Sequence, residues 1–128
     1  MRILVVEDQS SAAEALQLLL EADGHDVVVA ASYEKAVELV EAAANSQCYD
    51  VTFLDLKLPD GDGRDLVALV KGKCPQTRIY LATGSAVLQN DQDGLRFEDT
   101  SELARKLGAD GAIGKPIDYE QLCRLVQN

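Results

Sequence analysis

Hydrophobic and polar positions follow two alternating periodicities along the chain, which predict strands and helices in turn. Continuous apolar runs of strand length occur in five places. Between them, apolar residues recur three and four positions apart, which is the spacing of one helix face. The expected strands are residues 2–6, 26–30, 50–54, 78–83 and 110–114, and the expected helices are residues 10–25, 32–45, 63–73, 99–108 and 118–127.

Residues typical of helix ends support several of these boundaries. Ser11 with Glu14 has the spacing of a capping box in the first helix, and Gly24 suits its C-terminal end. Ser32 is the expected cap of the second helix, and Asp118 that of the last. These residues fix the predicted ends more closely than the apolar pattern does.

Strands that alternate with helices predict βαβ units and a parallel sheet covered on both faces, which is a three-layer α/β sandwich. The uninterrupted apolar strands agree, because strands of such sheets are buried on both sides. The 128 residues are expected to form a single domain, 1–128, and no repeat, linker or output domain is predicted within them. Residues 84–99 are the exception, since this acidic, turn-rich stretch is long for a connection in a compact α/β domain.

The charge balance changes the expected partners. The net charge is −10 and the isoelectric point is about 4.4, so direct binding of nucleic acid by this domain is disfavoured. A cation held by clustered carboxylates, or a basic protein surface, fits better. The plainer interpretation is that the charge only keeps the protein soluble.

Cysteine and hydropathy patterns bear on the cellular compartment. Cys48, Cys74 and Cys123 are far apart and odd in number, and His25 is the only histidine, so neither disulfides nor a zinc site are expected. A reduced, cytoplasmic setting is the resulting prediction. The apolar start is too short for a signal peptide, and no stretch approaches the ~20 apolar residues of a membrane span.

Polar residues follow four of the predicted strands at the point where each one ends. They are Glu7 and Asp8, Asp55, Thr83, and Lys115. The carboxyl ends of parallel strands share one edge of the sheet, where ligands bind in such folds. Clustered carboxylates repel one another unless a divalent cation lies among them, and oxygen ligands suit Mg²⁺.

A phosphoryl group would explain this set of residues. A carboxylate can attack phosphorus as a nucleophile, while a cation and a lysine neutralise the phosphoryl oxygens. Asp55 is then the phosphorylation site. Each residue has a plainer alternative: Asp55 could cap a turn, Glu7 and Asp8 the first helix, and Thr83 and Lys115 could be ordinary strand-end and turn residues.

Four short stretches together resemble the receiver domains of bacterial response regulators, the CheY-like family of two-component signalling. They are "ILVVED", "DLKLPDGDG", "LATG" and "GADGAIGKPID", and the resemblance covers essentially the whole chain. It implies a flavodoxin-like fold with strand order 2-1-3-4-5 and five helices. It also implies phosphoryl transfer to Asp55 from a sensor histidine kinase or a histidine phosphotransfer protein.

The resemblance assigns roles by position. Asp8, Asp55 and the backbone carbonyl of Lys57 match the ligands of Mg²⁺ (or Mn²⁺), with Glu7 acting through water. Thr83 matches the phosphate-sensing hydroxyl. Lys115 matches the phosphate-binding lysine.

One position departs from the family. Receiver domains usually carry an aromatic residue three positions before the lysine, and here that residue is Ala112. A methyl group cannot act as the usual rotamer switch. We therefore hypothesise that residues 84–99, which directly follow Thr83, report phosphorylation instead; the alternative is a surface insertion without a role.

The expected protein is a phosphorylation-dependent switch that acts through an unknown downstream protein, with a homodimer also possible. It is not a turnover enzyme, because it would only catalyse its own phosphorylation and slow dephosphorylation. A receiver-like docking module that works without phosphorylation is the alternative. An FMN carrier shares the topology, but the acids of "EDQSSA" would repel its phosphate.

Overall fold

The computed structural model describes residues 1–83, 87–91, 94–98, 100–114 and 119–126; at 83, 87–91, 94–98, 100–102, 114 and 119 it describes the backbone alone. Five parallel strands form the central sheet in the order β2-β1-β3-β6-β9. This order is the predicted flavodoxin-like topology, and it is confirmed. The strands are β1 (Arg2–Val6), β2 (Asp26–Ala30), β3 (Val51–Leu54), β6 (Arg78–Thr83) and β9 (Gly111–Gly114).

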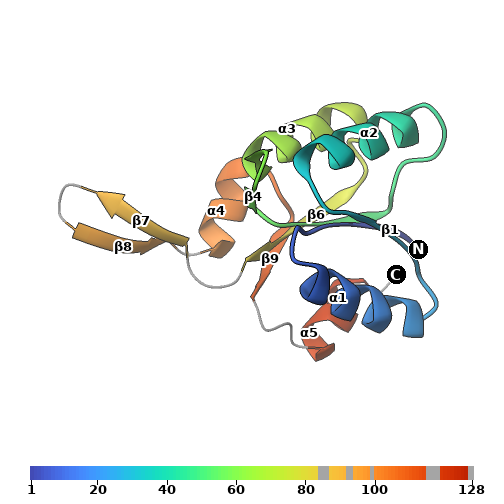
Figure 1. Cartoon of the computed structure of the whole chain (residues 1–128), viewed down its shortest axis with the longest axis horizontal. Helices are drawn as coiled ribbons and strands as arrows, with labels where there is room; N and C mark the ends of the chain where they lie inside the picture. The colour runs from blue at the N-terminus through green and yellow to red at the C-terminus, as the bar shows by residue number, and fades with distance from the viewer. Residues whose placement is uncertain (84–86, 92–93, 99, 115–118, 127–128) are drawn as a thin grey trace.

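Helices cover both faces of this sheet (Figure 1). One face carries α1 (Ser10–Ala22) and α5 (Tyr119–Leu125), and the other carries α2 (Tyr33–Ala44), α3 (Gly63–Lys73) and α4 (Thr100–Leu107). The core is therefore divided in two by the sheet. Successive residues of β1 show why: Ile3 and Val5 pack towards α1 and α5, while Leu4 and Val6 pack towards α2 and α3.

The predicted helix ends have mixed outcomes. Ser32 caps α2 as predicted, because its hydroxyl accepts the Lys35 N–H at 3.1 Å. The capping box of Ser11 and Glu14 was wrong. The N-cap of α1 is Gln9, whose carbonyl accepts the Ala13 N–H, so Ser11 lies within the first turn. The predicted cap at Asp118 lies outside the described residues.

Two short hairpins were not predicted. The smaller, β4 (Lys57–Leu58) with β5 (Gly61–Asp62), lies in the connection after β3. The larger, β7 (Val87–Asp91) with β8 (Gly94–Glu98), lies within residues 84–99, which were expected to be irregular. It extends away from the central sheet (Figure 1). The turn-type sequence "NDQDG" between two short β-prone runs was the signal that the prediction missed.

Cys48 and Cys74 form a disulfide, so the prediction that the chain has none was wrong. Their Cα atoms are 5.9 Å apart, although 26 positions separate them in the sequence. The reason is topological: α2 and α3 lie side by side on one face, and each cysteine follows the end of one of them. Cys123 is not part of a disulfide, and its Sγ donates to Asp23 Oδ2 at 3.3 Å. No helix in the described ranges is long and apolar enough to cross a membrane.

Candidate functional site at the carboxyl edge of the sheet

The carboxyl edge, defined here by Glu7, Asp8 and Asp55, lies where the two central strands end. Glu7 and Asp8 follow β1, and Asp55 follows β3, its parallel neighbour. The strand ladder continues one residue beyond each strand. The Asp55 N–H donates to the Val6 carbonyl at 3.0 Å, and the Glu7 N–H donates to the Ala30 carbonyl at 3.0 Å. The backbone of both acidic segments is therefore fixed by its neighbours.

The three carboxylates come together as the sequence predicts. One oxygen from each lies within 4.8 Å of one from the others. Glu7 is buried, with 4% of its surface exposed, while Asp55 is half-buried and Asp8 is exposed. Hard oxygen donors on a partly open surface suit a cation that keeps several waters, so these residues fit Mg²⁺ or Mn²⁺.

Backbone N–H groups orient two of the carboxylates. Glu7 Oε1 accepts the Gln9 N–H at 3.2 Å. Asp55 Oδ1 accepts the N–H of Lys57 at 3.0 Å, which links the acid directly to the first residue of β4. The side chain of Lys57 is exposed. Both bonds hold a carboxylate in place without removing its negative charge.

The other acids of the connection after β3 have a different task. Asp62 is the N-cap of α3, and its Oδ1 accepts the Arg64 N–H at 2.9 Å. This backbone hydrogen bond, together with the Arg64 guanidinium, lowers the pKa of Asp62 below its usual value against a small opposing effect of burial. Asp60 accepts two N–H groups of α2. These capping roles were missed in the sequence, because acids at a helix start and acids at a metal site look alike.

Gly63 allows α3 and the segment that follows β3 to approach closely. Its N–H donates to the Leu56 carbonyl at 2.9 Å. A Cβ at this position would lie 2.5 Å from the backbone oxygen of Asp55 and 2.7 Å from Cα of Leu56. Only glycine fits there without moving the backbone of Asp55 and Leu56.

The remaining predicted site residues are described in part. Thr83 ends β6 and pairs with Gly114 at the end of β9, but its side chain lies outside the described residues. Lys115, the next residue after Gly114, also lies outside them. Ala112 pairs with Leu81 and packs, half-buried, against the core beneath α3 and α4. The structure thus brings together the three acids, and the roles of Thr83, Lys115, Ala112 and the Lys57 carbonyl remain predictions.

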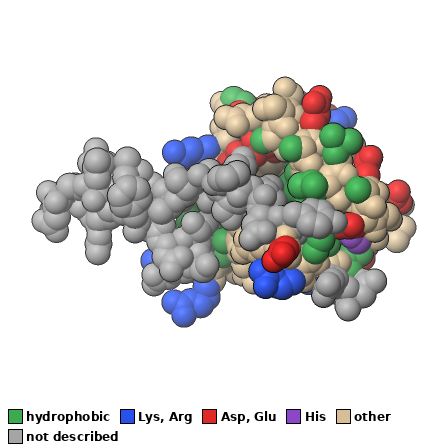
Figure 2. Space-filling view, turned by 90° about the horizontal axis from the view of Figure 1, so that it is seen from below, with side chains coloured by type: hydrophobic (Ala, Val, Ile, Leu, Met, Phe, Trp, Pro, Cys, Tyr) green, Lys and Arg blue, Asp and Glu red, His purple; other side chains and the backbone are tan. Residues whose placement is uncertain are grey.

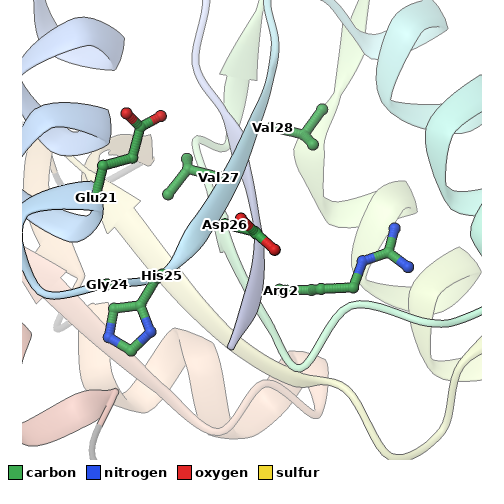
Figure 3. Close-up of a pocket in the computed structure, with 7 residues that line it drawn as sticks. All are labelled: Arg2, Glu21, Gly24, His25, Asp26, Val27 and Val28. Carbon is green, nitrogen blue, oxygen red and sulfur yellow. The ribbon is translucent and has the colours of Figure 1, made fainter.

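A shallow hollow lies at the opposite edge of the sheet, and its lining does not converge on one point (Figure 3). Arg2 and Val28 lie on one side of β2, whereas Glu21, Val27 and His25 lie on the other. His25 Nδ1 is 3.1 Å from the N-terminal amine, and Arg2 donates to the Gln47 carbonyl at 3.0 Å. These groups serve local structure.

Among the residues whose side chains are described, the face of α1 and α5 shows no second site. Its exposed hydrophobic side chains lie in separate spots among acidic and basic ones (Figure 2). Leu18 on α1 is 68% exposed, and Val28 on β2 is the other exposed large hydrophobic residue among those described. Single exposed hydrophobic residues are normal on a soluble domain.

Comparison with known proteins agrees with this geometry. Residues 3–127 match the family model described as the response regulator receiver domain. The chain is 31% identical over 121 residues to the alginate biosynthesis transcriptional regulatory protein AlgB of Pseudomonas aeruginosa. The aligned region covers 94% of this chain and 24% of that protein. It is 28% identical over 122 residues to the cell cycle response regulator CtrA of Brucella ovis, covering 95% of this chain and 47% of that protein. The chain thus spans less than half the length of these relatives.

Solved structures give the same result. A response regulator protein from Burkholderia pseudomallei, solved with a phosphorylated aspartic acid, a calcium ion and citrate, superposes with a TM-score of 0.77 at 28% identity; the match covers 99% of this chain and 66% of that one. A receiver domain protein from Clostridium thermocellum superposes with a TM-score of 0.74 at 29% identity, over 94% of this chain and 86% of that one. With its five-stranded parallel sheet and its acid cluster at the carboxyl edge, the chain belongs to the response regulator receiver domain family of two-component signalling.

Proposed function

We propose that this receiver is a phosphorylation-controlled switch that accepts a phosphoryl group on Asp55. The donor is the phosphohistidine of a sensor kinase or of a histidine phosphotransfer protein, which places the domain in the cytoplasm. The observation that carries the proposal is the convergence of Glu7, Asp8 and Asp55 within 4.8 Å at the ends of β1 and β3. The phosphorylated aspartic acid and the cation of the Burkholderia pseudomallei relative support it.

Asp55 is the acid of the three that suits nucleophilic attack. It is half-buried at the end of the central strand, and the Lys57 N–H holds one of its oxygens at 3.0 Å. A carboxylate oxygen forms a bond to phosphorus while the bond from phosphorus to the donor nitrogen breaks, and the electron pair leaves with the imidazole. Mg²⁺ or Mn²⁺, when bound, would neutralise charge on the phosphoryl oxygens. Asp8, Asp55 and the Lys57 carbonyl are the proposed ligands, with Glu7 acting through water.

Two further residues are proposed to meet the phosphoryl group. Thr83 ends β6 and pairs with Gly114, the last residue of β9, and Lys115 is the next residue in the sequence. A hydroxyl can donate to one phosphoryl oxygen, and an ammonium can neutralise another. Water then hydrolyses the acyl phosphate slowly, so the domain resets itself without acting as a turnover enzyme.

The output of this switch has to bypass Ala112. A half-buried methyl group packed against the core has no second rotamer to adopt. The hairpin of β7 and β8 begins four residues after Thr83, so a shift of Thr83 towards the phosphoryl group would act on it first. We propose that this hairpin reports phosphorylation to a downstream protein. Amide exchange of residues 87–91 and 94–98 that is identical with and without the phosphoryl group would contradict this role.

Ala112 also favours a second candidate, a docking module of the same fold that needs no phosphorylation. Without the aromatic switch, the surface near β9 need not change when Asp55 is modified. The three converging carboxylates argue against it, since a docking module has no use for clustered like charges. The two candidates differ in whether Asp55 takes up a phosphoryl group at all.

Intact-protein mass spectrometry after incubation with acetyl phosphate tests the proposal. We expect one added phosphoryl group that requires Mg²⁺. Asp55→Asn should abolish it, because the amide is not a nucleophile. Asp65→Asn is the matched control, since Asp65 is an exposed acid in the first turn of α3 and belongs to no part of the cluster. A folded protein without an adduct would favour the docking module.

A further inference from the structure

The connection after β3 is fastened to the start of α2 by a single carboxylate, Asp60. Its Oδ1 accepts the Tyr33 N–H at 2.8 Å, and its Oδ2 accepts the Glu34 N–H at 3.1 Å. Tyr33 and Glu34 are the first two residues of α2, whose N–H groups have no partner inside the helix. We call this pair of hydrogen bonds the Asp60 clasp. It joins segments 26 and 27 positions apart in the sequence.

The clasp satisfies most of the first turn of α2. The Ser32 hydroxyl accepts the Lys35 N–H. Ser32 and Asp60 together therefore accept the N–H groups of the first three residues of α2. The two N–H groups lower the pKa of Asp60 below its usual value, that of Tyr33 having the larger effect. Asp60 therefore stays charged at neutral pH and is engaged with the helix rather than with the acid cluster.

Close packing accompanies the clasp. Gly61 follows Asp60 and lies against the Tyr33 side chain, where a Cβ would come within 2.5 Å of the ring atom Cγ and 2.9 Å of Tyr33 Cβ. Gly61 pairs with Leu58 across the β4–β5 hairpin, and Asp62 pairs with Lys57. The β4–β5 hairpin thus packs against α2 on one side and is continuous with the loop that carries Asp55 on the other.

Few residues separate the clasp from Asp55 in one direction and from Glu7 in the other. Through the hairpin it reaches Lys57, whose N–H holds Asp55 Oδ1 at 3.0 Å. Through the start of α2 it reaches Ala30, the last residue of β2, whose carbonyl accepts the Glu7 N–H at 3.0 Å. The segment from Ala30 to Glu34 therefore touches the backbone beside Glu7 and the loop that carries Asp55.

We propose that Asp60 is a positioning residue for metal binding and phosphoryl acceptance, holding the Asp55 loop in register with the Glu7–Asp8 segment. The inference deepens the proposed function and rests on it. Asp60 is not itself a metal ligand, because both its oxygens face α2. Its loss would leave Asp55 present but its loop free to move away from Glu7, and small misplacements of reacting groups lower rates strongly.

The test compares Asp60→Ala, Asp60→Asn and wild type in two assays below their melting temperatures. The first measures the affinity of the unphosphorylated protein for Mn²⁺ by calorimetry, and the second the initial rate of phosphoryl uptake from acetyl phosphate. We expect Asp60→Ala to weaken Mn²⁺ binding and to slow uptake, each by about tenfold. Asp60→Asn keeps one acceptor oxygen and should recover part of both. Glu41→Ala, which removes an exposed acid from the middle of α2, is the matched control and should match wild type.

A second variant breaks the clasp without touching Asp60. Gly61→Ala forces the hairpin off Tyr33, so it should lower Mn²⁺ affinity in the same direction. If Asp60→Ala and Gly61→Ala both fold and bind Mn²⁺ within twofold of wild type, the positioning role is wrong. If wild type takes up no phosphoryl group, the proposed function fails, and Mn²⁺ affinity alone decides the clasp. Wild type that does not bind Mn²⁺ would overturn both.

Discussion

The two edges of the central sheet are held by different means. The carboxyl edge gathers three acids within 4.8 Å of one another, an arrangement in which like charges repel. The amino edge, defined here by Cys48, Tyr49, Cys74 and Thr77, carries a disulfide between the two cysteines. It also has a buried hydrogen bond of 2.6 Å from Thr77 Oγ1 to the Tyr49 carbonyl.

The side chains of the amino edge stabilise the fold, whereas those of the carboxyl edge are suited to binding a ligand. At the carboxyl edge the three carboxylates suit a cation, and without one their like charges repel each other. At the amino edge the side chains suit only the fold, and the Arg2 guanidinium adds to it by lying 4.9 Å from the centre of the Tyr49 ring. We therefore expect substitutions at the amino edge to alter stability and substitutions at the carboxyl edge to alter function.

The largest expected effect comes from the disulfide. Reduction should lower the free energy of unfolding by about 3.5 kcal/mol, because the bond closes a loop between residues 26 positions apart. Phosphoryl uptake by the folded, reduced protein should stay near that of the oxidised protein. Urea unfolding with and without a reductant measures the first quantity, and intact mass measures the second.

Cys123, the cysteine outside the disulfide, provides the control for that experiment. Cys123→Ser keeps the disulfide and should unfold like wild type in both conditions. A reduced protein that is equally stable would show that the hydrogen bonds of the amino edge suffice without the bond. A reduced protein that is folded but takes up no phosphoryl group would break the separation between the two edges.

Two buried threonines sharpen the comparison within the core. Thr77→Val removes the hydroxyl that donates to the Tyr49 carbonyl and should destabilise the protein by about 1–2 kcal/mol. Thr52→Val should have the opposite sign. Thr52 Oγ1, on β3, is buried and has no hydrogen-bond partner among the residues described, so replacing the hydroxyl by a methyl group should stabilise by about 1 kcal/mol. Urea unfolding of both variants measures the pair, and equal signs would contradict it.

Much of the fold could be predicted because the strands are mostly apolar. Residues 3–6 have no polar face, so burial on both sides and a parallel sheet follow from the sequence. The disulfide could not be predicted, since it depends on which helix ends lie side by side. The β7–β8 hairpin was missed because its polar residues disguise the strand pattern.

The acids of the site could be predicted because they follow the ends of predicted strands. Glu7 and Asp55 each follow an apolar run directly, Asp8 comes next after Glu7, and parallel topology then brings the three to one edge. Asp60 and Asp62 follow β3, as Asp55 does, and because all three are aspartates their residue type does not distinguish them. Only the helices show that these two acids cap α2 and α3, respectively.

A smaller effect tests the cost of the carboxyl edge. Asp55→Asn removes one of three clustered charges and should raise the stability of the metal-free protein by about 1 kcal/mol, although it abolishes phosphoryl uptake. Saturating Mg²⁺ should stabilise wild type more than the variant and so reduce this difference. Urea unfolding with a chelator and with Mg²⁺ measures both. A variant less stable than wild type without metal would show that the acids do not strain the fold.

The smallest effect is the pH dependence of the Asp60 clasp, which lies at the carboxyl edge but serves the fold as well. The pKa of Asp60 in the folded protein lies below its ordinary value of 3.8, because the charged form accepts N–H groups of Tyr33 and Glu34. Its contribution is therefore complete above about 3.8, the unfolded value, and is lost as the pH falls through the lower, folded pKa. Wild type should resist urea slightly better than Asp60→Asn at pH 7, and the two midpoints should converge as the pH falls below that value. The effect is small because the carboxylate is exposed to solvent. Midpoints that keep a constant separation down to acid unfolding would mean that the charge of Asp60 does not hold the clasp.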